Sequence, residues 1–223
     1  MAEPRHRIRI ILLVVFLSPL LFYLAMVRLS RPVFSQFPFA YSLAPQGDTV
    51  YHRLPAFSLQ DLRGGSLTDS ALRGTVTYLA FYSVRDTVGS IVLMGNLRRF
   101  YDNIDWESYD RVRFVLVNTG DSLNRYLPVA QRNAADPSYW IYASGDAETV
   151  RSLAGDALHL PEFQGKTASD LPLFSSQVAL VDKAGRVRKY YTGTDLGQIR
   201  KMEEDFRSLL LLEYPDDIKD KKN

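Results

Sequence analysis

The sequence predicts an α/β sandwich with a mixed central sheet, preceded by one transmembrane helix. Along most of the chain, β-branched and aromatic segments alternate with segments of helical periodicity, which is typical of α/β folds. The last two predicted strands are separated only by a short turn containing Gly185, so they must pair as an antiparallel hairpin. A sheet with parallel crossovers and one such hairpin is mixed.

The composition excludes several classes of chemistry. The chain has 223 residues, 46% of them hydrophobic, with 27 basic and 25 acidic side chains, which gives a packed core and no basic surface for nucleic acid. It contains no cysteine and three histidines, His6, His52 and His159. Disulfides, thiol nucleophiles and thiolate metal sites are therefore excluded. We expect no catalytic residue, no bound cofactor and no nucleic-acid partner.

An uncharged run over residues 10–27, bounded by Arg9 and Arg28, predicts a membrane anchor. At 1.5 Å per residue this run approaches the hydrocarbon thickness of about 30 Å, and it extends by one residue if Arg28 snorkels. No small-residue cleavage site follows, so we expect an uncleaved anchor in the lipid bilayer that begins at Ile10 and ends at Leu29. The basic residues before it favour a cytoplasmic head at 1–9. The predicted location is the bacterial cytoplasmic membrane, single-pass, with the folded domain in the periplasm.

Three further segments complete the predicted organisation. Residues 30–53 contain prolines and no periodicity, which indicates an extended juxtamembrane linker. The folded domain spans 54–214, and residues 215–223 form a charged tail.

The elements of the domain follow in order. A hairpin begins near Phe57, and Thr68 or Asp69 caps a short helical turn ending at Gly74. Residues 75–82 are β-branched and aromatic, as expected of a strand buried on both faces. The later elements are a helix over 90–104, a strand over 111–117, a helix capped by Asp121, a strand over 139–143, a helix capped by Asp146, the hairpin strands 177–181 and 187–191, and a helix over 196–212.

Four sequence blocks, in this order and spacing, resemble the SCO/SenC family. They are Leu-Pro-Ala-Phe-Ser-Leu at 54–59 with Gly-Gly-Ser-Leu at 64–67, the strand 75–81, Trp-Ile-Tyr at 140–142 with Gly-Asp-Ala-Glu at 145–148, and the closing hairpin with 190–195. Members of that family are membrane-anchored thioredoxin-fold proteins that deliver copper to cytochrome oxidase. The resemblance covers 54–212 and the anchor, and it implies a thioredoxin-like three-layer sandwich.

The same resemblance implies that the copper site is lost. The family carries Cys-x-x-x-Cys after its first central strand and a His before its penultimate strand. The corresponding positions here are Val84, Val88 and Phe174, or Leu173 if the register shifts by one residue. Copper(I) selects thiolates and imidazole, and these side chains offer no lone pair. We expect no metal site there, and we expect at least two of Val84, Val88 and Phe174 to pack as core.

The residues between and after these positions form a predicted interaction surface: Arg85, Asp86, Thr87 and Gly89. Gly89 replaces the family's usual proline. Acid–base chemistry by Arg85, Asp86 and Asp121 lacks a histidine or nucleophile, so helix capping or an exposed ion pair is the better interpretation of Asp86.

Two other sets of candidate residues are expected to be inert. The hydroxyls of Ser83, Ser175 and Ser176 lack a base partner. His52 and His159 are expected to lie at the surface, because no spacing forces them to converge with carboxylates.

The predicted function is a non-catalytic, membrane-tethered interaction or assembly factor for a respiratory oxidase or another envelope complex. Its partner would be a membrane or periplasmic protein, and the link to an oxidase rests on the resemblance alone. Two alternatives stay open. One is a copper chaperone or thiol oxidoreductase with unconventional ligands; the other is a small-ligand or haem-binding module that uses an apolar pocket at Val84, Val88 and Phe174.

Overall fold

The computed structural model of the chain describes residues 14–15, 17–25, 38–43, 49–83, 86–106, 109–119, 136–160, 162–163, 173–174 and 176–214. The chain divides into two compact units, Met1–Gln36 and Phe37–Asn223. In the first unit, residues 14–15 and 17–25 are helical and their large apolar side chains are exposed. Within the described part, no helix is long and apolar enough to span a bilayer. The rest of the predicted anchor, 10–13, 16 and 26–29, lies outside the described residues, as do the head and the charged tail.

The second unit is built on a seven-stranded mixed sheet in the order β11-β10-β5-β6-β7-β3-β4. Its strands are β3 (Ser58–Asp61), β4 (Ser66–Thr68), β5 (Val76–Tyr82), β6 (Val112–Asn118), β7 (Trp140–Ser144), β10 (Gln177–Val181) and β11 (Val187–Thr192). β5, β6 and β7 are parallel, whereas β10 pairs antiparallel with β5 and β3 pairs antiparallel with β7. The predicted mixed sheet is therefore confirmed.

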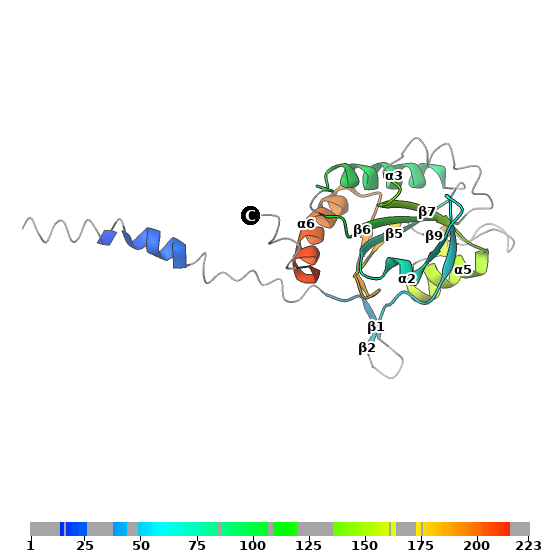
Figure 1. Cartoon of the computed structure of the whole chain (residues 1–223), viewed down its shortest axis with the longest axis horizontal. Coiled ribbons are helices and arrows are strands. Elements are labelled where there is room, and N and C mark those ends of the chain that lie inside the picture. Colours follow the sequence, from blue (N-terminus) through cyan, green and yellow to red (C-terminus); the bar gives the residue numbers. More distant parts are fainter. Residues whose placement is uncertain are drawn as a thin grey trace, which may run out of the picture. The chain divides into compact units, whose positions relative to one another are not determined.

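Helices cover both faces of this sheet (Figure 1). On one face, α3 (Thr87–Asp102) and α6 (Leu196–Glu213) pack against alternate residues of β5 such as Tyr78 and Ala80. On the other face, α2 (Asp69–Leu72), α5 (Ala147–Arg151) and the π-helical turn η2 (Ser152–Ala157) pack over Leu79 and Phe81. β5 is buried on both faces: every one of its residues is buried, and all except Thr77 belong to one of the two cores.

Aspartates begin three of the helices. Asp146 accepts a hydrogen bond from the Thr149 amide at 2.8 Å, which confirms the predicted cap of α5. Asp86 and Asp195 cap α3 and α6 in the same way. Thr68 precedes α2, as predicted, but its side chain makes no cap hydrogen bond. The predicted helix after Asp121 lies outside the described residues.

Part of the expected linker belongs to the folded unit. β1 (Tyr41–Leu43) pairs with β2 (Thr49–Tyr51), and the Ala40 amide donates to the Val187 carbonyl at 2.9 Å. The guanidinium of Arg188 lies 4.0 Å from the ring centroid of Phe39 and donates to the Pro38 carbonyl. The domain therefore begins before residue 54, because β11 is an edge strand and the segment that precedes residue 54 satisfies its backbone groups.

Two small features were not expected from the sequence. β8 (Glu162–Phe163) and β9 (Leu173–Phe174) form a separate two-stranded pair. The helix capped by Asp146 continues as the π-helical turn η2, which His159 follows with a positive φ of 48°.

Candidate functional site

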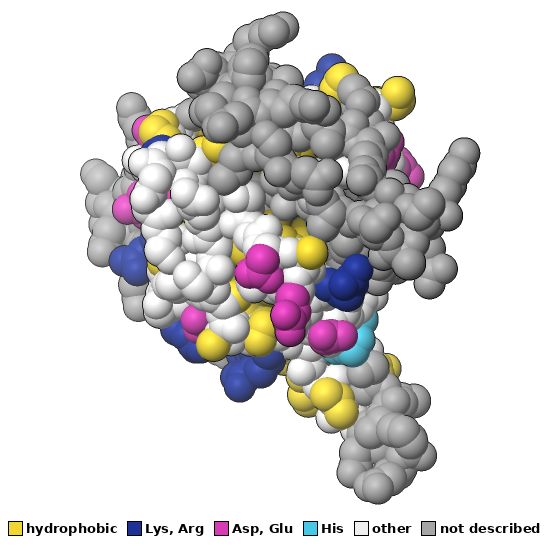
Figure 2. All heavy atoms as spheres, turned by 90° about the vertical axis from the view of Figure 1, so that its right-hand side faces the viewer, with side chains coloured by type: hydrophobic (Ala, Val, Ile, Leu, Met, Phe, Trp, Pro, Cys, Tyr) yellow, Lys and Arg dark blue, Asp and Glu magenta, His cyan; other side chains and the backbone are white. Residues whose placement is uncertain are grey.

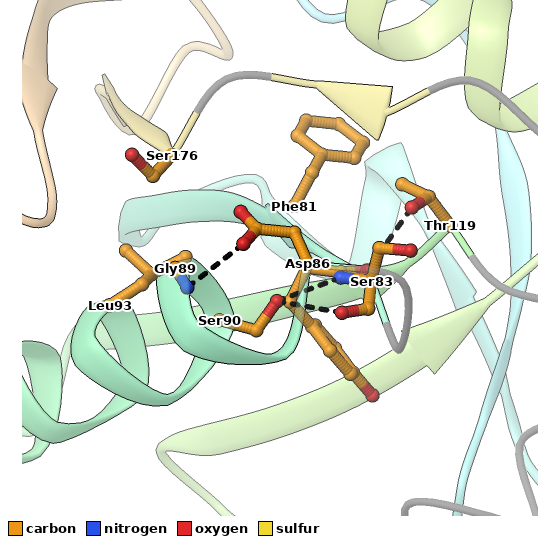
Figure 3. A pocket seen from close by; sticks show the side chains of 9 residues that line it. Phe81, Ser83, Asp86, Gly89, Ser90, Leu93, Thr119 and Ser176 are labelled. Atoms are coloured by element: carbon orange, nitrogen blue, oxygen red, sulfur yellow. Dashed lines mark hydrogen bonds between the residues drawn. The ribbon is translucent and has the colours of Figure 1, made fainter. Parts of the chain in front are cut away.

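The site implied by the resemblance lies where β5 ends and α3 begins. Figure 3 shows the residues that line a small cavity there, drawn from β5, α3, the end of β6 and the start of β10. These residues are Phe81, Tyr82, Ser83, Asp86, Gly89, Ser90, Leu93, Thr119 and Ser176. Because β5 lies between a parallel and an antiparallel neighbour, its carboxyl end opens beside two strands of opposite direction.

Hydrogen bonds to the backbone engage the hydroxyls of Ser90 and Thr119. Ser90 Oγ donates to the Ser83 carbonyl at 2.9 Å and accepts from the Ser83 amide at 3.0 Å (Figure 3). Thr119 donates from its amide to the Tyr82 carbonyl at 2.9 Å. Ser83, Ser90 and Thr119 are all buried. These groups fix the path of the loop, and no histidine lines the cavity to activate any of them.

Asp86 acts as the N-cap of α3, which is one of the two roles that the sequence left open for it. Its Oδ1 accepts from the Gly89 amide at 3.0 Å, a contact drawn in Figure 3. A Cβ atom on Gly89 would lie 2.1 Å from Asp86 Oδ2, so the cap requires glycine at this position. Proline, the family's usual residue here, has no N–H to donate. A proline at position 89 could therefore not donate this hydrogen bond to Asp86, whereas glycine can.

The cavity at this site is very small. Its volume is about 10 Å³, which is room for about one water molecule. A haem or a drug-sized ligand needs several hundred Å³. The described residues here therefore do not form the apolar ligand pocket that one of the alternative functions requires.

The expectation that Val88 packs in the core is wrong. Its side chain is 75% exposed on the first turn of α3, because the second residue of this helix faces away from the core. Val84 and Arg85 lie outside the described residues. Phe174 lies in β9, where its backbone pairs with Glu162, and the expectation about its side chain falls outside what the structure describes.

Val88 is instead part of an apolar surface. Ile91 is 58% exposed and Val92 is 40% exposed. The spacing of these residues, i, i+3 and i+4, puts them on one face of a helix. We call Val88, Ile91 and Val92 the α3 stripe. It lies directly beside Asp86 and Gly89, two of the four residues predicted as an interaction surface.

The expectation that His52 lies at the surface is wrong. His52 is buried, and its ring centroid lies 4.3 Å from that of His159. His159 is exposed, as expected. The sequence held no signal for this proximity, because β2 and the end of η2 meet only through the fold. Within the described ranges, no group of three or more His, Cys, Asp or Glu side chains could hold a metal ion.

The sheet order and the helices on its two faces define a thioredoxin-like fold, and comparisons with solved structures agree. No family model matches the chain, and no curated protein matches its sequence. Among solved structures it is similar to an SCO1/SenC family lipoprotein from Bacillus anthracis, with a TM-score of 0.62, 18% identity, and coverage of 72% of this chain and 96% of that one.

Two further structures show the same likeness. BsSco, a member of the Sco family of cytochrome c oxidase assembly proteins, matches with a TM-score of 0.60 and 16% identity over 73% of this chain and 95% of its own. ScoI from Arabidopsis thaliana, solved with copper bound, matches with a TM-score of 0.55 and 19% identity over 69% and 98%. The SCO/SenC resemblance predicted from the sequence is thus confirmed at the level of the fold.

Proposed function

We propose that the protein is a membrane-tethered, non-catalytic interaction module that uses the SCO-like fold as a docking scaffold. The observation that carries this proposal is the α3 stripe, an exposed apolar face at the mouth of the former copper site. Three neighbouring apolar side chains at 40–75% exposure are costly to leave in water. A protein partner that covers them gains that burial free energy, as apolar contact patches do at interfaces.

The chemistry around the stripe supports a non-catalytic role. Val88 stands where the resemblance places a copper thiolate, and valine has no donor atom. The Ser90 hydroxyl and the Asp86 carboxylate are both committed to backbone groups. A protein that retains the fold and replaces its ligands fits a binding role better than a catalytic one.

For the partner, we propose a respiratory oxidase or another envelope membrane complex. Support comes from the structural similarity to BsSco, a member of the Sco family of cytochrome c oxidase assembly proteins. The proposal also includes the uncleaved anchor at 10–29 with the folded domain outside the cytoplasm. A reporter that is active only outside the cytoplasm, fused after Asn223, should be active; activity of a cytoplasm-only reporter there would contradict this topology.

The docking surface is tested by site-specific cross-linking in cells. A photoreactive amino acid placed at Val88 should capture a membrane-complex subunit, identified by mass spectrometry after purification in mild detergent. The matched control is the same amino acid at Lys201, an exposed position on α6, the other helix on this face of the sheet. Capture at Val88 and not at Lys201 is the expected result.

Equal capture at both positions, or capture of unrelated soluble proteins alone, would overturn the docking proposal. A Val88→Asp variant adds a second measurement, because a buried charge at the contact should weaken co-purification of the captured subunit. Since Val88 is exposed, this substitution leaves the fold intact, and lost co-purification reports on the contact itself.

A further inference from the structure

Three segments that are distant in sequence bring two imidazoles together. His52 follows β2 near the start of the folded unit, His159 follows η2, and Tyr190 lies in β11. The rings of His52 and His159 have centroids 4.3 Å apart and planes inclined by 43°. The Tyr190 hydroxyl lies 2.9 Å from His52 Nδ1. None of these three residues lines the cavity beside α3.

His52 presents an unused ligand atom. His52 is only 8% exposed, and its Nε2 is buried with no hydrogen-bond partner among the described residues. A buried nitrogen without a hydrogen-bond partner is uncommon, because buried polar atoms nearly always have one. When Nδ1 donates its proton to the Tyr190 oxygen, Nε2 carries the lone pair.

His159 is held at an energetic cost. With a φ of 48° it is the one non-glycine residue of positive φ in the described ranges, a conformation that L-residues adopt only infrequently. Helices often end on such a residue, but it is usually glycine. The π-helical turn η2 immediately before it is a feature frequent at functional sites. Together these features hold an imidazole against His52 where glycine would be the easier choice.

We propose that His52 and His159 form a binding site for a divalent transition-metal ion of the borderline class, such as Zn²⁺, Cu²⁺ or Ni²⁺. Imidazole nitrogen is a preferred ligand for these ions. With metal–nitrogen bonds of about 2.0–2.1 Å, two imidazoles that bind one ion at right angles have centroids about 4.5 Å apart, which agrees with the observed separation. Tyr190 is then the hydrogen-bonding partner that fixes the tautomer of His52.

The site would be reached from the His159 side, because His159 is exposed while His52 Nε2 is buried. No third His, Cys, Asp or Glu side chain joins the pair within the described residues, so water or an external ligand completes the coordination. Figure 2 shows a face of the molecule on which a histidine side chain lies near both acidic and basic side chains. This inference does not rest on the proposed docking function, because the α3 stripe and the histidine pair share no residue.

The test uses the full chain in detergent, with His6→Gln in every sample so that the third imidazole does not contribute. Zn²⁺ alone is titrated by calorimetry at pH 7.5, and the Cu²⁺ form is examined by electron paramagnetic resonance. We expect one equivalent bound and a spectrum showing two nitrogen ligands. His159→Asn should weaken Zn²⁺ binding at least about tenfold and remove one nitrogen. Because asparagine tolerates a positive φ and the position is exposed, this variant should still fold.

Tyr190→Phe is the matched control, since it leaves both imidazoles in place. It should keep the two-nitrogen spectrum while weakening the affinity by about tenfold or more, as loss of a partner to a metal-bound histidine does. Zn²⁺ affinity unchanged by His159→Asn would overturn the proposal. A Cu²⁺ spectrum with fewer than two nitrogens in the His6→Gln protein would overturn it as well.

Discussion

At the scale of single residues, Val88 shows that an apolar side chain at a former ligand position is not necessarily buried. The direction of its Cβ is set by its place in the first turn of α3, not by its hydrophobicity. Because the side chain is 75% exposed, Val88→Ala should change the free energy of unfolding by less than about 0.5 kcal/mol. Urea denaturation measures this change.

Leu93, on the same helix, is the control for Val88. It is 1% exposed and packs in the core between α3 and the sheet, so Leu93→Ala should cost about 2–5 kcal/mol. Similar losses for the two variants would mean that Val88 is packed after all.

His52 gives the domain a specific pH dependence. Burial and the neighbouring His159 lower its pKa below the ordinary value of 6.5, so the unfolded chain binds the proton more tightly than the folded one. The contribution of His52 to stability is therefore complete above pH 6.5, and it is lost as the pH falls through the lower folded pKa. The free energy of unfolding, measured in EDTA, should fall between pH 7.5 and 5.5.

A His52→Gln variant separates this effect from the carboxylates. Amide donors lower the pKa values of Asp136 and Asp146 from 3.8, so these groups act only in more acidic solution. The variant should lose part of the slope between pH 7.5 and 5.5. Identical slopes for wild type and variant would contradict the assignment to His52.

At the scale of elements, the end of α6, the β10–β11 turn and β11 are joined by a buried ion cluster. Arg188 Nη1 lies 3.1 Å from Asp182 Oδ2 and 3.4 Å from Glu213 Oε1. The side chains of Arg188 and Asp182 are 3% and 0% exposed. Arg188→Met would leave two buried carboxylates short of a cation and should cost about 3–5 kcal/mol of unfolding free energy.

Arg186→Met is the comparison for that cluster. Arg186 also contacts Asp182, at 2.8 Å, but its side chain is 34% exposed, so its removal should cost only about 1 kcal/mol or less. Chemical denaturation measures the loss of unfolding free energy for both variants. Equal losses would contradict the idea that the burial of Arg188 makes its ion pairs the more important ones.

The elements also show which signals a sequence carries. β5 and β6 were predictable because burial on both faces leaves continuous runs of β-branched and aromatic residues. Asp86 and Asp146 were predictable as caps because capping is local in sequence. The attachment of residues 38–53 to β11 was not, since proline-rich segments without periodicity look alike whether or not a distant strand pairs with them. The contact of His52 with His159 could not be predicted for the same reason, because it forms only when segments distant in sequence fold together.

At the scale of the whole molecule, the folded unit should be separable from residues 1–36. A chain that begins at residue 37 keeps the hydrogen bonds of Ala40 and His52 to Val187 and of Arg188 to Pro38. A chain that begins at residue 54 loses all of them and exposes part of β11. The second chain should be at least about 2 kcal/mol less stable, at roughly 1 kcal/mol for each hydrogen bond.

Comparison of urea midpoints for the two chains, both with the same C-terminus, tests this boundary. Equal midpoints would show that the segment before residue 54 is a passive linker, as the sequence alone suggested. A lower midpoint for the shorter chain would place the start of the domain before β1.

The attachment of Pro38, Phe39 and Ala40 to β11 also decides how the domain bears mechanical load. Tension applied to the chain ahead of residue 38 enters the fold through the Arg188 guanidinium and the Ala40–Val187 hydrogen bond. The same Arg188 side chain pairs with the buried carboxylates of Asp182 and Glu213, and these ion pairs connect β11 to the end of α6. A pull from the N-terminal side is therefore resisted first by these hydrogen bonds at the edge strand β11, which the buried ion pairs of Arg188 hold to the end of α6.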